Sequence, residues 1–272
     1  MTACSSYYLH DVICLYLFYL FYVNSKFFSF CYKKRQLIVR SLIHITNFTS
    51  KRNRFTSCNI STKVVKVVAQ YISNPLIEVF NVSLSVGEFA DNLKLAKVIP
   101  VYKADDKLCV NNYRPISVFA FSKVLERLVY DRLKSFLDKN NILTDKQYGF
   151  REKHSTCVAL LNLIDQISEQ IDSKMTVVGI FIDLSKAFDT IDHNILLAKL
   201  SFYGIRGIAK KWFSSYLTNR QQYVQIQHVA SNLLTIRSGV PQGSILGPLL
   251  FLLYVNDMVT CLLYTSPSPR DS

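Results

Sequence analysis

Apolar residues recur at intervals of three and four in five segments of the chain. Residues with this spacing share one face of a helix, so the pattern predicts amphipathic helices. The predicted helices cover residues 73–85, 122–139, 156–171, 193–200 and 208–217. Gly87 is expected to end the first helix, and Ser155 or Thr156 to cap the third.

Two of these helices carry long apolar stripes, which we assign to the core. The stripe of helix 122–139 comprises Leu125, Leu128, Val129, Phe136 and Leu137. The stripe of helix 156–171 comprises Val158, Leu161, Ile164, Ile167 and Ile171. Neither stripe is assigned a function.

Other segments show the shorter, β-branched pattern of strands. Residues 95–102 form such a run, broken by Pro100, and residues 177–183 form a second that ends in the carboxylate of Asp183. Residues 223–229 and 233–237 alternate as a hairpin would. Residues 244–254 are apolar and follow a Pro-Gln-Gly turn. Because strands alternate with helices, the predicted fold class is mixed α/β (α+β).

The first 62 residues differ in composition from the rest. Residues 12–23 are entirely apolar, but a bilayer span needs about 20 such residues, and polar residues interrupt the run at 24–26. We interpret the segment as a short buried helix or as translated non-coding sequence. A membrane anchor through residues 12–32 is the alternative, and we do not expect a membrane partner.

The net charge of +13 is weaker evidence for a nucleic-acid partner than its size suggests. Ten of the 32 Lys and Arg residues, but one of the 19 acidic residues, lie within residues 1–66. The seven cysteines show no CxxC spacing and no zinc pattern with histidine, so no zinc site is predicted. Scattered thiols in odd number indicate an intracellular protein, nuclear or cytoplasmic.

Three short motifs occur in a fixed order. They are NYRPIS at residues 112–117, FIDLSKAFD at 181–189 and SGVPQGSILGPL at 238–249. Together they resemble the reverse transcriptase domain of LINE-like (non-LTR, Jockey-like) retrotransposons, over roughly residues 64–259. The resemblance implies the fingers and part of the palm of a right-hand polymerase. It implies RNA-directed DNA synthesis on an RNA template with a DNA primer and dNTPs.

Asp183 is the candidate catalytic residue and metal ligand. In the resembled family the matching aspartate binds two Mg²⁺ ions, which stabilise the attacking and leaving oxygens of nucleotidyl transfer. A carboxylate at a strand end suits a hard cation, which prefers oxygen ligands. Without the motif around it, Asp183 would be an ordinary carboxylate at the end of a strand. Asp189 belongs to the family pattern without being a metal ligand there, and Asp192 is expected to cap helix 193–200.

The remaining candidates would bind the nucleotide. Phe188 matches the family position under the incoming sugar, where a bulky ring excludes a 2′-hydroxyl; the alternative is a core aromatic. Gln242 and Gly243 would let backbone and amide approach the nucleotide or template, since Gly243 has no Cβ; the alternative is a plain turn. Arg114 and Lys103 are expected to contact the triphosphate, Arg114 with a fork suited to phosphate oxygens. Lys103 could equally be a solvated surface lysine.

The sequence departs from the family pattern in three places. No aromatic–x–Asp–Asp motif follows residue 257, so we expect this chain to lack polymerase activity. Residues 261–271 match the translation of a sequencing adapter, so 261–272 is interpreted as an artefactual tail; a natural Ser/Pro-rich tail is the alternative. Residues 117–122 are one residue shorter than is usual, which affects the expected geometry near Arg114.

These observations divide the chain into four parts. They are an atypical segment at 1–62, a fingers-like part at 63–176, a partial palm at 177–260 and the tail at 261–272, with no thumb. The predicted function is that of a truncated RNA-directed DNA polymerase. The alternatives are a non-enzymatic nucleic-acid-binding remnant and a membrane-anchored protein. No protein partner is predicted.

Overall fold

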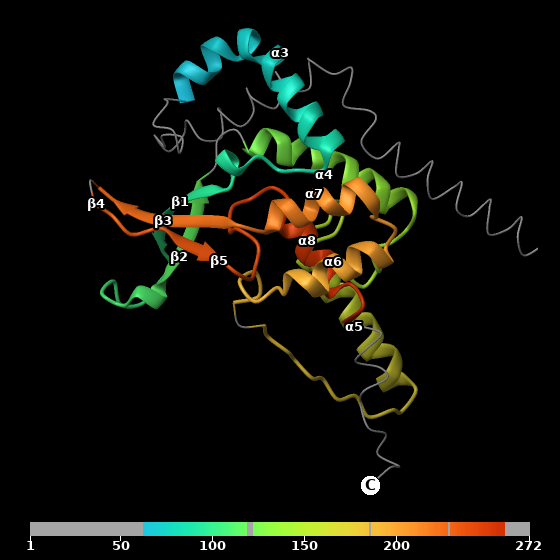
Figure 1. The fold of residues 1–272 in the computed structure, drawn as a ribbon. Coiled ribbons are helices and arrows are strands. Elements are labelled where there is room, and N and C mark those ends of the chain that lie inside the picture. Colours follow the sequence, from blue (N-terminus) through green and yellow to red (C-terminus); the bar gives the residue numbers. More distant parts are fainter. Residues whose placement is uncertain (1–61, 119–121, 185, 228, 259–272) are drawn as a thin grey trace, which may run out of the picture.

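The computed structural model of the chain describes residues 62–118, 122–184, 186–227 and 229–258. Within them a five-stranded sheet lies beside a group of helices (Figure 1). The helices are α3 (Thr62–Val86), α4 (Ser122–Lys139), α5 (Thr156–Asp172), α6 (His193–Phe202), α7 (Gly207–Leu217) and α8 (Gly247–Val255). The strands are β1 (Leu95–Tyr102), β2 (Tyr113–Val118), β3 (Arg220–Ile226), β4 (Val229–Ala230) and β5 (Leu234–Ile236). The mixed α/β class is therefore confirmed.

The sheet has the order β2-β1-β3-β4, and β5 also pairs with β3. Strand β1 runs antiparallel to β2 and parallel to β3. Its predicted bounds are confirmed, while β2 was not foreseen. The predicted hairpin is present as β3 and β5, although β3 begins earlier, at Arg220, and Val229 belongs to β4.

Two prolines face each other in the β1–β2 pair, at Pro100 and Pro115. The backbone N–H of Lys103 donates to the carbonyl of Asn112 at 2.9 Å. Hydrogen-bonded and non-hydrogen-bonded pairs alternate in an antiparallel ladder, so the two prolines occupy a non-hydrogen-bonded pair. Neither missing N–H therefore removes a bond between the strands. The same alternation turns the N–H of Ser117 away from β1, toward the outer edge of β2.

The core lies between α4, α6, α7, α8 and the end of α3. The predicted stripe of α4 is confirmed, since Leu125, Val129 and Leu137 are buried and the other two members pack partly buried against them. Phe89 packs edge-on against the rings of Trp212 and Tyr216. Burial of these large apolar side chains is the main stabilising contribution in this part of the molecule.

Side-chain and glycine caps fix the ends of three helices. The Ser155 hydroxyl accepts from the Val158 N–H at the start of α5, and the Asp192 carboxylate accepts from Asn194 and Ile195 at the start of α6. Gly87, with φ +74°, ends α3 as predicted. Helix α3 nevertheless begins eleven residues earlier than expected, at Thr62, and contains Pro75. Proline is favoured in the first turn of a helix, so a helix that continues through it is not apparent from spacing alone.

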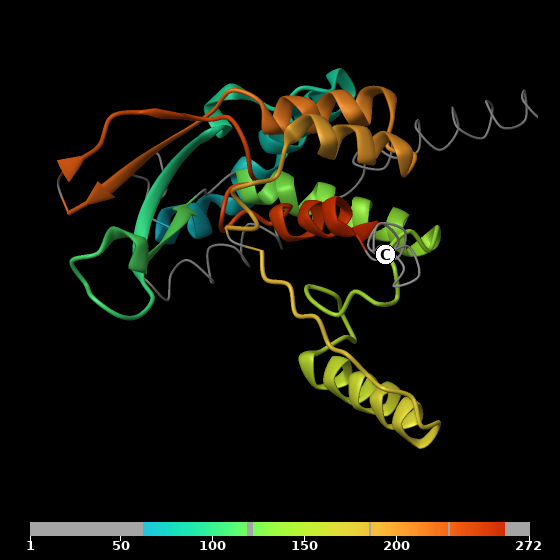
Figure 2. The same ribbon diagram turned by 90° about the horizontal axis from the view of Figure 1, so that it is seen from below.

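The prediction that the apolar stripe of α5 lies in the core is wrong in this structure. No residue of α5 is buried, and Leu161 is 60% exposed. Figure 2 shows α5 and the extended segment after it standing away from the rest of the molecule. The described residues place no second element against the apolar face of α5, and without one a helical stripe has nothing to pack on.

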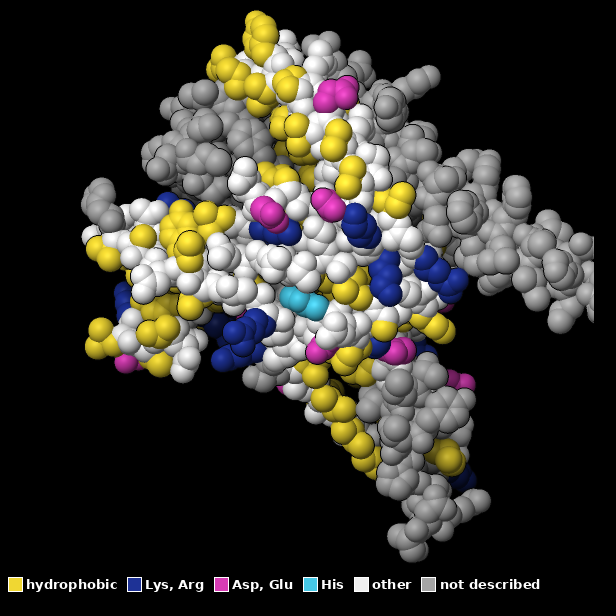
Figure 3. Space-filling view, in the orientation of Figure 1, with side chains coloured by type: hydrophobic (Ala, Val, Ile, Leu, Met, Phe, Trp, Pro, Cys, Tyr) yellow, Lys and Arg dark blue, Asp and Glu magenta, His cyan; other side chains and the backbone are white. Residues whose placement is uncertain are grey.

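The predicted strand at residues 177–183 is also absent. This segment is extended but forms no ladder with any described strand, and Phe181 is 91% exposed. Figure 3 shows a row of apolar side chains along it. A β-branched run becomes a strand only when a neighbour satisfies its backbone N–H and C=O groups, and no described segment lies in register with it.

No helix among the described residues is long and apolar enough to cross a membrane. The apolar run at residues 12–32 and the tail at 261–272 lie outside the described residues.

Candidate active site

The second and third motifs meet in a backbone junction. The N–H of Val240 donates to the carbonyl of Phe188 at 2.8 Å, and the N–H of Gly239 donates to the carbonyl of Ile191 at 2.8 Å. The Ser238 hydroxyl donates to the carbonyl of Asp189 at 3.1 Å. Residues 188–191 and 238–240 are thus held together by three hydrogen bonds, although about fifty residues of chain separate them.

Gly239 is the residue that allows this close approach. Its φ is +82°, in the left-handed region that favours glycine. A Cβ atom at this position would lie 2.7 Å from both the Asp189 Cα and the Phe188 carbonyl oxygen. Both are backbone atoms that cannot rotate away, so only glycine fits.

The first motif joins the same junction at the edge of β2. The outward N–H of Ser117 donates to the carbonyl of Gln242 at 2.8 Å. Gly243 has a φ of +98°, and a Cβ there would lie 2.9 Å from the Ser117 carbonyl oxygen. The Pro-Gln-Gly turn therefore lies against the free edge of β2, and all three motifs converge on one place.

A buried carboxylate on α4 also forms a hydrogen bond with the residues that follow the turn. Glu126 on α4 is fully buried, and its Oε2 accepts from the N–H of Ile245 at 2.7 Å. Tyr216 on α7 is equally buried. Burial raises the pKa of its phenol well above the ordinary value, an effect that the charge of Glu126 adds to and that of Arg220 opposes.

Phe188 is half-buried between two other phenyl rings. The ring of Phe251 on α8 lies 4.9 Å away, and the ring of Phe150 lies 5.8 Å away at 85°. Both separations are typical of favourable aromatic pairs. The side chain is thus fixed by its neighbours at the margin of the core.

Gln242 makes a side-chain contact that was not predicted. Its Nε2 donates to both carboxylate oxygens of Asp189, at 3.0 and 3.1 Å. The sequence signal was present, because Asp189 is an acid within the second motif. The motif alone, however, did not show that Asp189 faces the glutamine of the third motif rather than solvent.

Arg114 and Lys103 share one face of the β1–β2 hairpin. Arg114 lies opposite Val101, and opposite residues in an antiparallel pair have their side chains on the same face. Lys103 follows Val101 by two residues, so it joins that face. Ile116, whose Cγ2 would lie 3.4 Å from a Gly243 Cβ, belongs to it as well. Arg114 is two residues from Ile116, roughly 7 Å along the strand from the Pro-Gln-Gly turn. Both cations are exposed.

Asp183 is not part of the junction. It is exposed in the extended segment described above, five residues before Phe188. Within the residues that the structure describes, no group of three His, Cys, Asp or Glu side chains is placed to hold a metal ion. The structure therefore brings together Phe188, Gln242 and Gly243, with the Arg114 face beside them, and leaves Asp183 apart.

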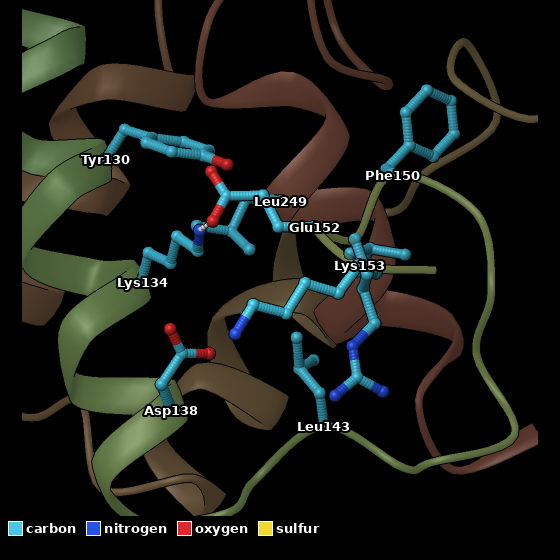
Figure 4. A pocket seen from close by; sticks show the side chains of 10 residues that line it. Tyr130, Lys134, Asp138, Leu143, Phe150, Glu152, Lys153 and Leu249 are labelled. Atoms are coloured by element: carbon cyan, nitrogen blue, oxygen red, sulfur yellow. Dashed lines mark ion pairs between the residues drawn. The ribbon is translucent and has the colours of Figure 1, made fainter. Parts of the chain in front are cut away.

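A separate cavity of about 230 Å³ opens between α4, α8 and residues 143–153 (Figure 4). Lys134 and Glu152 form an ion pair of 2.5 Å at its wall. The hydrogen bond with Lys134 lowers the pKa of Glu152, and the same bond raises the pKa of Lys134. The Arg151 guanidinium, also in the lining, donates to the carbonyl of Thr144 at 2.6 Å, and this bond stabilises the loop.

All three motifs lie in a region of the chain that is similar to known proteins. Residues 101–264 match the family described as reverse transcriptase (RNA-dependent DNA polymerase). The chain is 33% identical over 221 residues to the probable RNA-directed DNA polymerase from transposon BS of Drosophila melanogaster, covering 78% of this chain and 23% of that protein. It is 31% identical over 211 residues to the RNA-directed DNA polymerase from mobile element jockey of the same organism, covering 74% and 22%.

A third relative is the probable RNA-directed DNA polymerase from transposon X-element of Drosophila melanogaster. The identity is 34% over 188 residues, covering 66% of this chain and 20% of the relative. The chain thus spans less than a quarter of the length of these curated relatives.

Proposed function

Because this chain belongs to the reverse transcriptase (RNA-dependent DNA polymerase) family, we propose that it carries the nucleotide-binding part of a retrotransposon polymerase that copies RNA into DNA. Residues 63–176 are assigned to a fingers-like part and residues 177–260 to part of a palm. The partners are an RNA template with its DNA primer, and the substrates are dNTPs.

The observation that carries this proposal is the convergence of the three motifs. NYRPIS, FIDLSKAFD and SGVPQGSILGPL supply Ser117, Phe188 and Gln242 to one junction, through backbone bonds of 2.8 Å. Gly239 and Gly243, both with positive φ, let these distant segments approach at backbone distance. A nucleotide site needs backbone and side chains fixed at such short range.

Each residue at the junction has a role that its surroundings support. The exposed guanidinium of Arg114 offers a planar fork for phosphate oxygens, with Lys103 on the same face as a second cation. The ring of Phe188 is held by Phe150 and Phe251, so it can act as a fixed wall under the sugar and exclude a 2′-hydroxyl. Gly243 lets the turn lie close to β2 and brings Gln242 beside the bound nucleotide.

Mg²⁺ is the cofactor that this chemistry requires, and Asp183 is the ligand that we assign to it. Two ions held by several carboxylates would stabilise the attacking and leaving oxygens of nucleotidyl transfer. The described residues do not by themselves fit two ions, since Asp183 supplies one carboxylate and no group of three His, Cys, Asp or Glu side chains among them is placed to hold a metal ion. We therefore propose that the 272-residue polypeptide alone does not add nucleotides.

The proposal is tested on a polypeptide extended along its own transcript to the length of the curated relatives. Mg²⁺-dependent addition of dNTPs to a primer on an RNA template is expected. Asp183→Ala should reduce the rate by more than the ~10²–10³ that loss of one transition-state donor costs. Asp192→Ala, which removes only the cap of α6, is the matched control and should retain activity. An unchanged rate in Asp183→Ala would contradict the assignment.

The 272-residue polypeptide tests the second half of the proposal. It should show no Mg²⁺-dependent incorporation above that of its own Asp183→Ala variant. Incorporation that the variant abolishes would show that the site is complete in this polypeptide.

A further inference from the structure

The bond between Gln242 and Asp189 fixes the direction of the glutamine amide. An ionised carboxylate has only acceptors, so the amide NH₂ must be the end that faces it. Nε2 lies 3.0 and 3.1 Å from the two carboxylate oxygens, so one donor group serves both. The carbonyl oxygen Oε1, at the other end of the planar amide, therefore points away from Asp189.

We infer that Asp189 is a positioning residue for the nucleotide site: it holds Gln242 so that its Oε1 is offered as a hydrogen-bond acceptor to the bound nucleotide or template. This inference rests on the proposed function of Gln242. The ligand group that it selects is a donor, an N–H or O–H, rather than a phosphate oxygen. A freely rotating amide would offer either end, and half of its orientations would present NH₂ instead.

Asp189 can perform this task because its own backbone is fixed. Its N–H donates to the carbonyl of Lys186 at 2.8 Å, and its carbonyl accepts from the Ser238 hydroxyl. Gly239 also packs closely against its Cα. A side chain with a single methylene on such a backbone has a short reach, so its carboxylate occupies a defined place.

Gln242 is fixed by its backbone as well, through the bond from Ser117. Its side chain is half-buried, whereas that of Asp189 is exposed. The pair thus connects the second motif to the third at a side-chain level, in addition to the backbone bonds between them. The exposed position of Asp189 also indicates that the core does not require this carboxylate for packing.

The test is nuclear magnetic resonance of the ¹⁵N-labelled 272-residue chain, observing the Gln242 side-chain amide. Gln242→Leu identifies the signal by removing it. Asp189→Ala removes the acceptor, and Asp189→Asn retains one neutral acceptor oxygen. Asp192→Ala is the control, since it removes a carboxylate three residues away that bonds to α6 instead of Gln242. Thermal unfolding of each variant checks that the fold is retained.

In the wild-type chain and Asp192→Ala, the Gln242 amide should be ordered, with signals well separated from those of the exposed glutamines. In Asp189→Ala it should become mobile and move toward the exposed values, with Asp189→Asn between the two. If the signal is the same in Asp189→Ala as in the wild type, the inference is wrong, whether or not a nucleotide binds.

The same samples are then titrated with dTTP and Mg²⁺. The wild-type amide should shift on binding, and Asp189→Ala should bind roughly two- to tenfold more weakly, because the freed Gln242 side chain must then be ordered when the nucleotide binds. Equal affinity in the two would overturn the inference and leave the proposed function intact. If dTTP shifts no signal near Phe188 or Gln242 in the wild-type chain, the assignment of the nucleotide site fails, and the inference fails with it.

Discussion

The three-motif junction and the segment that carries Asp183 are close in sequence but differ in backbone hydrogen bonding and in burial. Residues 188–191 are bonded through their backbone to residues 238–240 and lie against a core that includes Leu196 and Leu250. Residues 177–184 have no ladder, and Ile180 and Phe181 are more than four-fifths exposed. The residues proposed to bind the nucleotide are thus held by the described chain, and the proposed metal ligand is not.

A motif alone does not show whether its residues are held in place by contacts with the rest of the described chain. The two regions differ in this respect. The junction is completed by contacts within the described residues, above all by Gly239 and Gly243. The Asp183 segment has the composition of a buried strand, yet the described residues supply no neighbour for its backbone. The exposed stripe of α5 belongs to the same part of the molecule, and both segments carry exposed large apolar side chains.

One substitution in each region tests most directly whether the two regions differ in packing. Leu250→Ala in α8 should destabilise the chain by about 2–5 kcal/mol, because it leaves a cavity in a fully buried site. Leu161→Ala in α5 should change the free energy of unfolding by less than about 0.5 kcal/mol, since the side chain is 60% exposed. Urea denaturation measures both. A loss of several kcal/mol for Leu161→Ala would show that α5 is packed in solution.

A smaller effect is expected from two glycines with positive φ. Gly239→Ala combines a left-handed backbone, costing about 1–2 kcal/mol, with backbone contacts at 2.7 Å, so a loss above ~2 kcal/mol is expected. Gly207→Ala is the matched control, because its φ is +58° but nothing lies within 4 Å of the added Cβ. It should lose about 1 kcal/mol. Equal losses in denaturant unfolding would mean that the close approach at Asp189 contributes nothing.

The smallest effect concerns the Lys134–Glu152 pair. The bond with Lys134 lowers the pKa of Glu152 below its ordinary 4.5, so its contribution is present above pH 4.5 and is lost as the pH falls through the lowered value. The raised pKa of Lys134 adds stability that is present below pH 10.5 and is lost at still higher pH. Glu152 is 80% exposed, so the pair is weak.

Glu152→Gln should therefore lower the thermal midpoint slightly at pH 7, and the difference from the wild type should shrink as the pH falls below 4.5. The difference should shrink in high salt, which screens exposed charges. A large, salt-independent loss at pH 7 would show that the cavity wall depends on this ion pair.

The sequence predicted the elements whose evidence is local. The apolar stripe of α4, the run at β1, and the caps at Ser155 and Asp192 are each set by neighbouring residues, and the structure confirms them. The first eleven residues of α3, about three turns, were missed because proline within a helix is rare. Strand β2 was missed because Arg114-Pro115 gives an extended backbone that indicates a turn as readily as a strand.

The motifs indicated which residues to consider for the candidate site but not how those residues are arranged. Motif order indicated Phe188, Gln242 and Gly243, and the structure brings them to one junction. The partner of Gln242 could not be predicted, because the pairing with Asp189 depends on how two distant segments pack. The prediction of a strand at 177–183 was wrong for a different reason. The composition is that of a strand, but a strand also needs a neighbouring strand, and no local pattern shows whether one is present.

The most direct test of this contrast is hydrogen exchange of the backbone amides in the 272-residue chain. The amides of Ser117, Gly239 and Val240 should be protected nearly as well as those of β1, because each donates within the junction. The amides of residues 177–183 should exchange at close to unprotected rates. Protection of residues 177–183 equal to that of β1, or rapid exchange at Gly239 and Val240, would contradict the account.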